Sequence, residues 1–133
     1  MRNAFTVGLV LILIVALVQQ SLPYFYKAYT LDISTEEARA RRFSLIIDVR
    51  TPQEREEWGY YPNSIPLPLN QLQKELPQLI ADKNAALLVY ANGDERAKQA
   101  ADMLYDLGYH SARYLKGTYL AMLPPGSHSG IGF

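Results

Sequence analysis

The side chains that could perform chemistry lie at the ends of two apolar segments. Asp48 and Arg50 end the first segment, and Asp94, Glu95 and Arg96 follow the second. Such groups could act in catalysis, but a polar pair at the end of a buried strand more often ties that strand to a neighbouring loop or helix. No nucleophile and general base occur together, so an enzyme of unrecognised mechanism is the weakest of the functional hypotheses.

Composition excludes several other kinds of site. The 133 residues contain no cysteine, which excludes disulfides, thiolate metal ligands and thiol nucleophiles. Histidine occurs only at His110, behind a helix stop, and at His128, in the tail, so neither a metal nor another cofactor is expected. Thirteen Lys and Arg balance 13 Asp and Glu without a run of like charge, so nucleic acid is not an expected partner.

The N-terminus carries an apolar run that is just long enough to span a membrane. No charge occurs from Ala4 to Val18, and the run can be extended to Leu22. About 19 helical residues at ~1.5 Å each cover roughly 28 Å, close to the thickness of the hydrocarbon core. We therefore expect residues 1–22 to form a single-pass anchor in the lipid bilayer, followed by a juxtamembrane linker over residues 23–32. The linker contains a belt of side chains that prefer the membrane interface, namely Tyr24, Phe25, Tyr26, Lys27 and Tyr29.

Two alternatives remain for this run. Arg2 supplies the basic start of a cleaved signal peptide, although Val18 to Ser21 lack a good small-x-small cleavage site. The run could also be a buried helix of a globular domain. Basic residues lie on both sides of the run, so the positive-inside rule does not decide on which side of a membrane the remainder lies.

Behind the linker, apolar runs alternate with helix signals. The runs at 44–49 and 85–90 are typical of strands buried on both faces, and a shorter strand is expected at 111–115. Between the first two, Pro62, Pro66 and Pro68 permit only a short edge-like segment. Strands that alternate with helices on short connections predict an α/β fold with a mostly parallel sheet and helices on both faces.

Helix signals stand before and between these strands. Ser34 begins an S-x-x-E capping pattern, and Thr51 with the proline behind it opens a short helix that ends at Gly59. A longer helix is predicted over residues 70–80, with Asn70 as its cap and a break or late restart at Pro77, and another over 97–107. A last helical turn is predicted over 117–123, and the glycine- and serine-rich residues 124–133 are expected to form a flexible tail.

Three segments, in this order and spacing, resemble the rhodanese homology domain. The first is the strand that contains Asp48, continued by Arg50 and a Pro-x-Glu helix start with Glu54. The second begins at Gly59 and is similar to the family's Gly-His-Ile-Pro-Gly-Ala-Ile segment, and the third is similar to its closing Leu-x-Gly-Gly segment through Gly117. The resemblance implies a rhodanese-like domain over residues 33–123. In it, the motif residues have a structural role, namely Asp48, Arg50, Glu54, Gly59 and Gly117.

The resemblance also implies where the family's chemistry would lie. In the family, a six-residue loop behind a buried strand begins with cysteine and ends with arginine, and its backbone N–H groups hold a persulfide or an anion. The matching residues here are Ala91, Asn92, Gly93, Asp94, Glu95 and Arg96. Ala91 takes the position of the nucleophile, and a methyl group cannot carry sulfur. Asp94 and Glu95 oppose anion binding, and Arg96 is expected to pair with one of them or with solvent.

These observations predict a non-catalytic, membrane-anchored rhodanese-like module that binds protein. Its expected role is that of an accessory subunit or recruiting domain of a membrane protein assembly. The alternative is a sensor of a small anion or sulfur species, in which residues 91–96 bind the ligand without turnover. Trp58, on the short helix before Gly59, either covers the core or faces a partner.

Overall fold

The computed structural model describes residues 2–27 and 30–124, and within residues 2–27 it describes the side chains of residues 3 and 6–17. The chain divides into two compact units, one ending at Thr30 and the other beginning at Leu31. Each unit is described by itself.

The first unit is a single helix, α1 (Arg2–Lys27). Its described apolar side chains are exposed, from Val7 to Leu17. No helix in the described part of the chain has both the length and the apolar character that a membrane span requires. The predicted span over residues 1–22 is therefore not supported there, and the helix continues through residues 23–27, where a linker was predicted. The predicted belt from Tyr24 to Tyr29 lies outside the described side chains.

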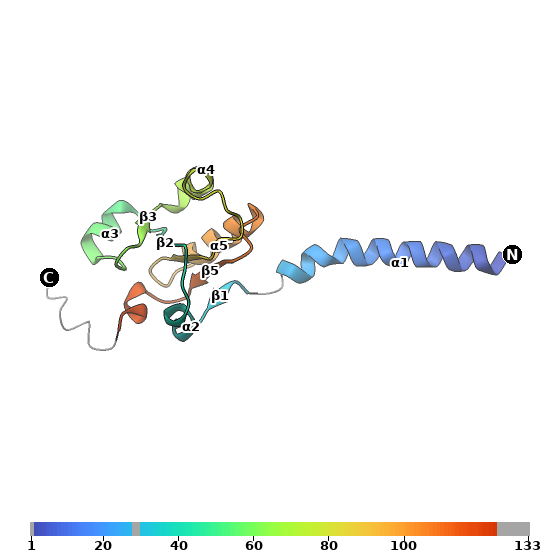
Figure 1. The fold of residues 1–133 in the computed structure, drawn as a ribbon, viewed down its shortest axis with the longest axis horizontal. Helices are drawn as coiled ribbons and strands as arrows, with labels where there is room; N and C mark the ends of the chain where they lie inside the picture. The colour runs from blue at the N-terminus through green and yellow to red at the C-terminus, as the bar shows by residue number, and fades with distance from the viewer. Residues whose placement is uncertain (1, 28–29, 125–133) are drawn as a thin grey trace. The chain divides into compact units, whose positions relative to one another are not determined.

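The second unit is built on a parallel sheet of five strands in the order β1-β5-β4-β2-β3 (Figure 1). The strands are β1 (Asp32–Ile33), β2 (Leu45–Asp48), β3 (Ile65–Pro66), β4 (Leu87–Tyr90) and β5 (Ala112–Leu115). In the central pair, Asp48 lies beside Tyr90. The segments that follow β2 and β4 therefore leave the sheet at the same edge.

Helices cover both faces of this sheet. They are α2 (Thr35–Ala40), α3 (Pro52–Trp58), α4 (Leu69–Leu79), α5 (Arg96–Asp106) and the 3₁₀ turn η1 (Tyr119–Met122). Ile47 and Val89 point to one face and pack with Leu72 of α4 and Leu104 of α5. Alternate strand residues point to the other face, which α2 and η1 cover with a smaller cluster that includes Ala38, Leu88, Tyr90, Leu115 and Met122.

The predicted α/β fold with a parallel sheet is confirmed, and so are the three predicted strands within about two residues. Two local predictions were wrong. The helix predicted to be capped by Asn70 begins at Leu69, because the N–H of Leu69 donates to the carbonyl of Val49 at 3.1 Å. This helix also continues through Pro77, which lies in its last turn, where a proline removes only one intrahelical hydrogen bond.

The start of α3 agrees with its sequence signal. Thr51 caps the helix: its hydroxyl accepts from the N–H of Glu54 at 3.2 Å, and the Glu54 carboxylate accepts from the N–H of Thr51 at 2.8 Å. This reciprocal capping box fixes Glu54 in the first turn of α3, at the carboxyl edge of the sheet.

Candidate functional site

The candidate site is the loop between β4 and α5, at the carboxyl edge of the sheet. Ala91 follows the fully buried strand and is itself inaccessible to solvent, packed in the larger core cluster. Gly93 has a φ of +80°, a left-handed conformation that a side chain disfavours. The loop thus turns away from the core behind Ala91, and residues 93–95 are exposed.

The guanidinium of Arg96 is held by two carboxylates. Its Nη1 and Nη2 donate to Glu54 at 2.7 and 2.8 Å, and its Nη2 also donates to Asp94 at 2.8 Å. The Nε atom donates to both oxygens of Asp94 at 3.1 and 3.2 Å. Hydrogen bonds from Arg96 lower the pKa of Glu54 to about 2 and also lower the pKa of Asp94.

This arrangement leaves little for an external anion. One positive charge on Arg96 faces two negative charges on Glu54 and Asp94, so the three groups together carry −1, and the exposed Glu95 beside them adds a further negative charge. The Nε and both terminal nitrogens of the guanidinium already donate to carboxylates, which are its strongest hydrogen-bond acceptors. Glu54 of α3 and Asp94 of the loop therefore satisfy the guanidinium of Arg96.

A buried ion pair lies beneath the loop. Asp48 and Arg50 are 1% and 2% exposed, and the guanidinium donates to both carboxylate oxygens of Asp48 at 2.8 Å. Arg50 also donates to the carbonyl of Gly59 at 2.6 Å and to Oδ1 of Asn92 at 3.1 Å. Its guanidinium carbon lies 5.4 Å from the centre of the Tyr90 ring. The pair thus joins β2 to the end of α3 and to the loop.

Three further residues complete this network and were not singled out in the sequence. Arg55 donates to Asp48 at 3.1 Å and to the carbonyl of Ser64 at 2.8 Å. The hydroxyl of Ser64 lies 3.0 Å from that of Tyr90, whose pKa is raised by burial. The one available signal was Tyr90 itself, a polar-tipped residue at the end of an otherwise apolar strand.

Gly59 and Trp58 lie next to this network, at the end of α3. Gly59 has a φ of +73°, and the hydroxyl of Tyr119 donates to the adjacent carbonyl of Trp58 at 3.0 Å. The side chain of Trp58 is 57% exposed and so faces outward. Gly117 has open space where a Cβ would lie. Within the described residues, no group of His, Asp and Glu could hold a metal ion, and His128 lies outside them.

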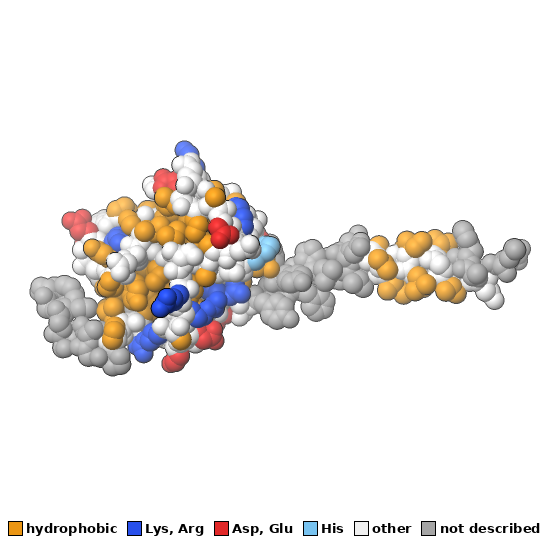
Figure 2. Space-filling model, in the orientation of Figure 1, with side chains coloured by type: hydrophobic (Ala, Val, Ile, Leu, Met, Phe, Trp, Pro, Cys, Tyr) orange, Lys and Arg blue, Asp and Glu red, His pale blue; other side chains and the backbone are white. Residues whose placement is uncertain are grey.

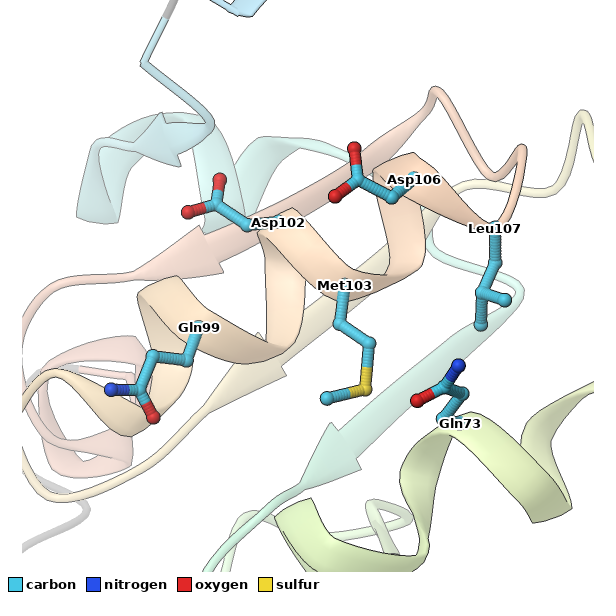
Figure 3. A pocket seen from close by; sticks show the side chains of 6 residues that line it. All are labelled: Gln73, Gln99, Asp102, Met103, Asp106 and Leu107. Carbon is cyan, nitrogen blue, oxygen red and sulfur yellow. The ribbon is translucent and has the colours of Figure 1, made fainter.

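A separate hollow of about 510 Å³ lies between α4 and α5, on the face of the sheet opposite α2. Figure 3 shows Met103 of α5 and the following Leu107 pointing towards Gln73 of α4, whereas Asp102 and Asp106 of α5 point away from α4. The hollow includes none of the residues 91–96, and its lining offers carboxylates and amides but no nucleophile paired with a base. It adds nothing to the chemistry of the loop.

Comparison with known proteins agrees with the fold. The profile of the Rhodanese-like domain family matches residues 33–123. Thiosulfate sulfurtransferase PspE of Escherichia coli (strain K12) is 30% identical over 63 residues, which are 47% of this chain and 60% of PspE. The matching stretch therefore spans less than two thirds of that relative.

Two solved structures show the same fold. Protein hp1203 of Helicobacter pylori 26695 is 30% identical, with a TM-score of 0.57 over 69% of this chain and 81% of its own. The human single-domain sulfurtransferase TSTD1 is 23% identical, with a TM-score of 0.59 over 70% of this chain and 95% of its own. Sulfurtransferases are thus among the proteins that resemble this chain, which itself contains no cysteine.

Proposed function

Because this chain belongs to the rhodanese-like domain family but has no cysteine, we propose that it is a non-catalytic module that binds protein. The single observation that carries this proposal is the state of the loop: Ala91 stands at its start, and Arg96 at its end is held by Glu54 and Asp94. Sulfur transfer needs a thiolate to carry the sulfur and a positive site to receive an anionic donor. Neither is available in residues 91–96.

The retained framework supports a binding role. The buried pair of Asp48 and Arg50 and the left-handed Gly59 hold the carboxyl edge of the sheet in a fixed shape. A rigid edge with exposed side chains, including Trp58, is suited to recognise another protein. The proposed role is that of an accessory subunit or recruiting domain of a membrane protein assembly.

A turnover assay tests the absence of catalysis. The purified full chain is incubated with thiosulfate and cyanide, and separately with a phosphate monoester, while PspE serves as the positive control with thiosulfate. We expect no product above the buffer rate. Robust turnover of either substrate by the wild-type chain would reject the proposal.

Co-purification tests the binding role. The protein is isolated in mild detergent from the membranes of its source, and the accompanying chains are identified and their stoichiometry is measured. A partner at a fixed ratio is the expected result. A lone, monodisperse chain would contradict the proposal.

Attachment to a membrane through α1 is a further part of the proposal. It is supported by the charge-free run from Ala4 to Val18 and by the exposed apolar side chains of the helix. Carbonate extraction tests it: the wild-type chain should stay in the membrane pellet, and L11D/I14D should be released. The matched variant L79D/L120D changes two exposed leucines of the domain and should stay in the pellet. Equal extraction of the wild type and both double variants would reject attachment through α1.

The second candidate function is a sensor of a small anion. It is favoured by the six-residue loop and by Arg96 at its end, and opposed by the two carboxylates that occupy that arginine. Calorimetric titration with sulfate, thiosulfate and phosphate decides between the sensor and the protein-binding module. Saturable binding at or below millimolar concentration would favour the sensor, and its absence would end it.

A further inference from the structure

The sheet face covered by α2 and η1 is open on one side. These two short elements cover one part of the face and leave a groove of about 460 Å³ over β2 and the segment before β3. Ile46 of β2, Phe43 and Tyr61 lie in this groove and are only partly buried, although Ile47, which points to the other face, is inaccessible. Met122 of η1 forms part of the wall. Residues 30–124 therefore leave an apolar depression at this place.

Three arginines line this groove, namely Arg39, Arg41 and Arg42. Arg39 donates to the carbonyls of Ala121 and Leu123 at 2.6 and 3.0 Å, which fixes the wall but leaves its positive charge uncompensated by a carboxylate. No lining residue is Asp or Glu, and in the described chain no ion pair forms at any of the three arginines. Within the described residues, the groove thus combines an apolar floor with a positive rim that no carboxylate pairs.

We propose that this groove binds an acidic peptide segment of a partner protein, which inserts one aromatic or aliphatic side chain against Phe43, Ile46 and Met122. The inference rests on the proposed protein-binding function and names its surface and the chemistry of its partner. Carboxylates of the peptide complement the rim, since arginine binds them with paired hydrogen bonds. The apolar floor supplies the pocket that an anchoring side chain requires.

The shape of the site favours a peptide over a membrane. A lipid headgroup could neutralise the arginines, but a flat bilayer surface would leave the floor of a concave groove unfilled. Figure 2 shows Lys and Arg side chains next to a hydrophobic area in the lower half of the domain, where Figure 1 places α2 and η1. The guanidinium of Arg41 lies 5.7 Å from the centre of the Phe43 ring, so charge and apolar surface are contiguous at the rim.

Fluorescence anisotropy with labelled peptides tests the proposal. The probes are a nonapeptide of Asp and Glu with a central Phe, the same peptide with a central Ser, and the same peptide with Lys for every acidic residue. The protein is the full chain, as the wild type, as R41E/R42E, and as the control K74E/K98E. The control makes the same charge change on α4 and α5, at the opposite face.

We expect saturable binding of the acidic Phe peptide, weakened about tenfold or more by R41E/R42E and little changed by K74E/K98E. The Ser and Lys peptides should bind at least about tenfold more weakly. Backbone amide shifts in an NMR titration should centre on Phe43, Ile46 and Met122. Circular dichroism of R41E/R42E confirms that the variant is folded.

Three results would overturn the inference: equal binding of the Phe and Lys peptides, equal weakening by both double variants, or no binding of any peptide by a chain that sediments with phosphatidylglycerol vesicles. The proposed function fails separately. If a native partner co-purifies at the same ratio with wild type and with R41E/R42E, the domain binds protein through another surface, and only the groove is rejected. If no partner co-purifies with the wild type, the binding role fails, whatever the peptides show.

Discussion

Glu54 and Arg96 are 42 residues apart in the chain, yet the Glu54 carboxylate accepts two hydrogen bonds from the Arg96 guanidinium, at 2.7 and 2.8 Å. The capping box places Glu54 at the start of α3, and the loop behind β4 brings Arg96 to the same edge of the sheet. A group of the domain itself thus occupies the arginine that would otherwise face an incoming anion. The first two predictions follow from this pair.

Glu54→Gln should reduce the acid sensitivity of the domain. The pKa of Glu54 is about 2 in the folded chain and 4.5 in the unfolded chain, so the pair stabilises the fold fully above pH 4.5 and loses this effect as the pH falls towards 2. The side chain is partly exposed, so we expect a contribution of about 1 to 2 kcal/mol. Urea unfolding at pH 7 and pH 3 measures how much stability each chain loses on acidification. Glutamine is chosen because its side-chain oxygen can still accept the hydrogen bond from the N–H of Thr51.

Asp94→Asn is the comparison for this variant, because the carboxylate of Asp94 also binds Arg96 but is more exposed. Its effect on acid sensitivity should be smaller than that of Glu54→Gln. An equal loss of stability between pH 7 and pH 3 in wild type and Glu54→Gln would contradict the role given to this pair.

Ala91→Cys should produce a thiol that reacts slowly. Ala91 is inaccessible, and the nearby carboxylates oppose the thiolate more than the start of α5 favours it. The wild type has no cysteine, so any thiol label reports the introduced residue. The rate with a maleimide at pH 7.5 should be lower than that of Gln99→Cys, at an exposed position of α5, and should rise in A91C/E54Q/D94N. A faster rate for Ala91→Cys than for Gln99→Cys would show that the loop still activates a thiol.

Asp48→Ala should destabilise the domain strongly. Arg50 cannot lose its proton and would remain buried without its carboxylate, which costs about 3 to 5 kcal/mol. The midpoint of urea unfolding measures the effect. Lys116→Ala removes the exposed ion pair with Asp32 at the surface and should leave the midpoint nearly unchanged. Similar shifts for both variants would contradict a special role for the buried pair.

Gly59→Ala should also destabilise the domain, by about 1 to 3 kcal/mol. The φ of Gly59 is +73°, and a Cβ there would lie 2.7 Å from the hydroxyl of Tyr119, which it would displace from the carbonyl of Trp58. Gly117→Ala is the matched control, since nothing lies within 4 Å of its Cβ position. Thermal unfolding should separate the two variants, and an equal Tm would argue against strain at Gly59.

The elements that could be predicted are those with a local signal. Apolar runs marked β2 and β4, and the Thr51-Pro52 pair marked α3. The two-residue strand β1 has no pattern of its own, because it is defined by pairing with β5. The start of α4 depends on the carbonyl of Val49, which lies 20 residues earlier in the chain, and so no local cap could reveal it.

The site was predictable only in part, for the same reason. The sequence predicts that Arg96 pairs with its chain neighbours Asp94 or Glu95, or with solvent. The pairing with Glu54 depends on how α3 lies against the loop, which no spacing encodes. The groove lined by Arg39, Arg41 and Arg42 is likewise formed by α2, η1 and the segment before β3, which are far apart in the sequence.

The two outer strands of the sheet, β1 and β3, have only two residues each, and β3 ends in Pro66. Proline offers no backbone donor, and two residues present too little free backbone for an added strand to continue the sheet. Partner recognition by strand addition is therefore disfavoured at either edge of the described sheet. Selectivity for a partner then depends on side chains, so that a few surface substitutions could redirect this domain to another protein without altering its fold.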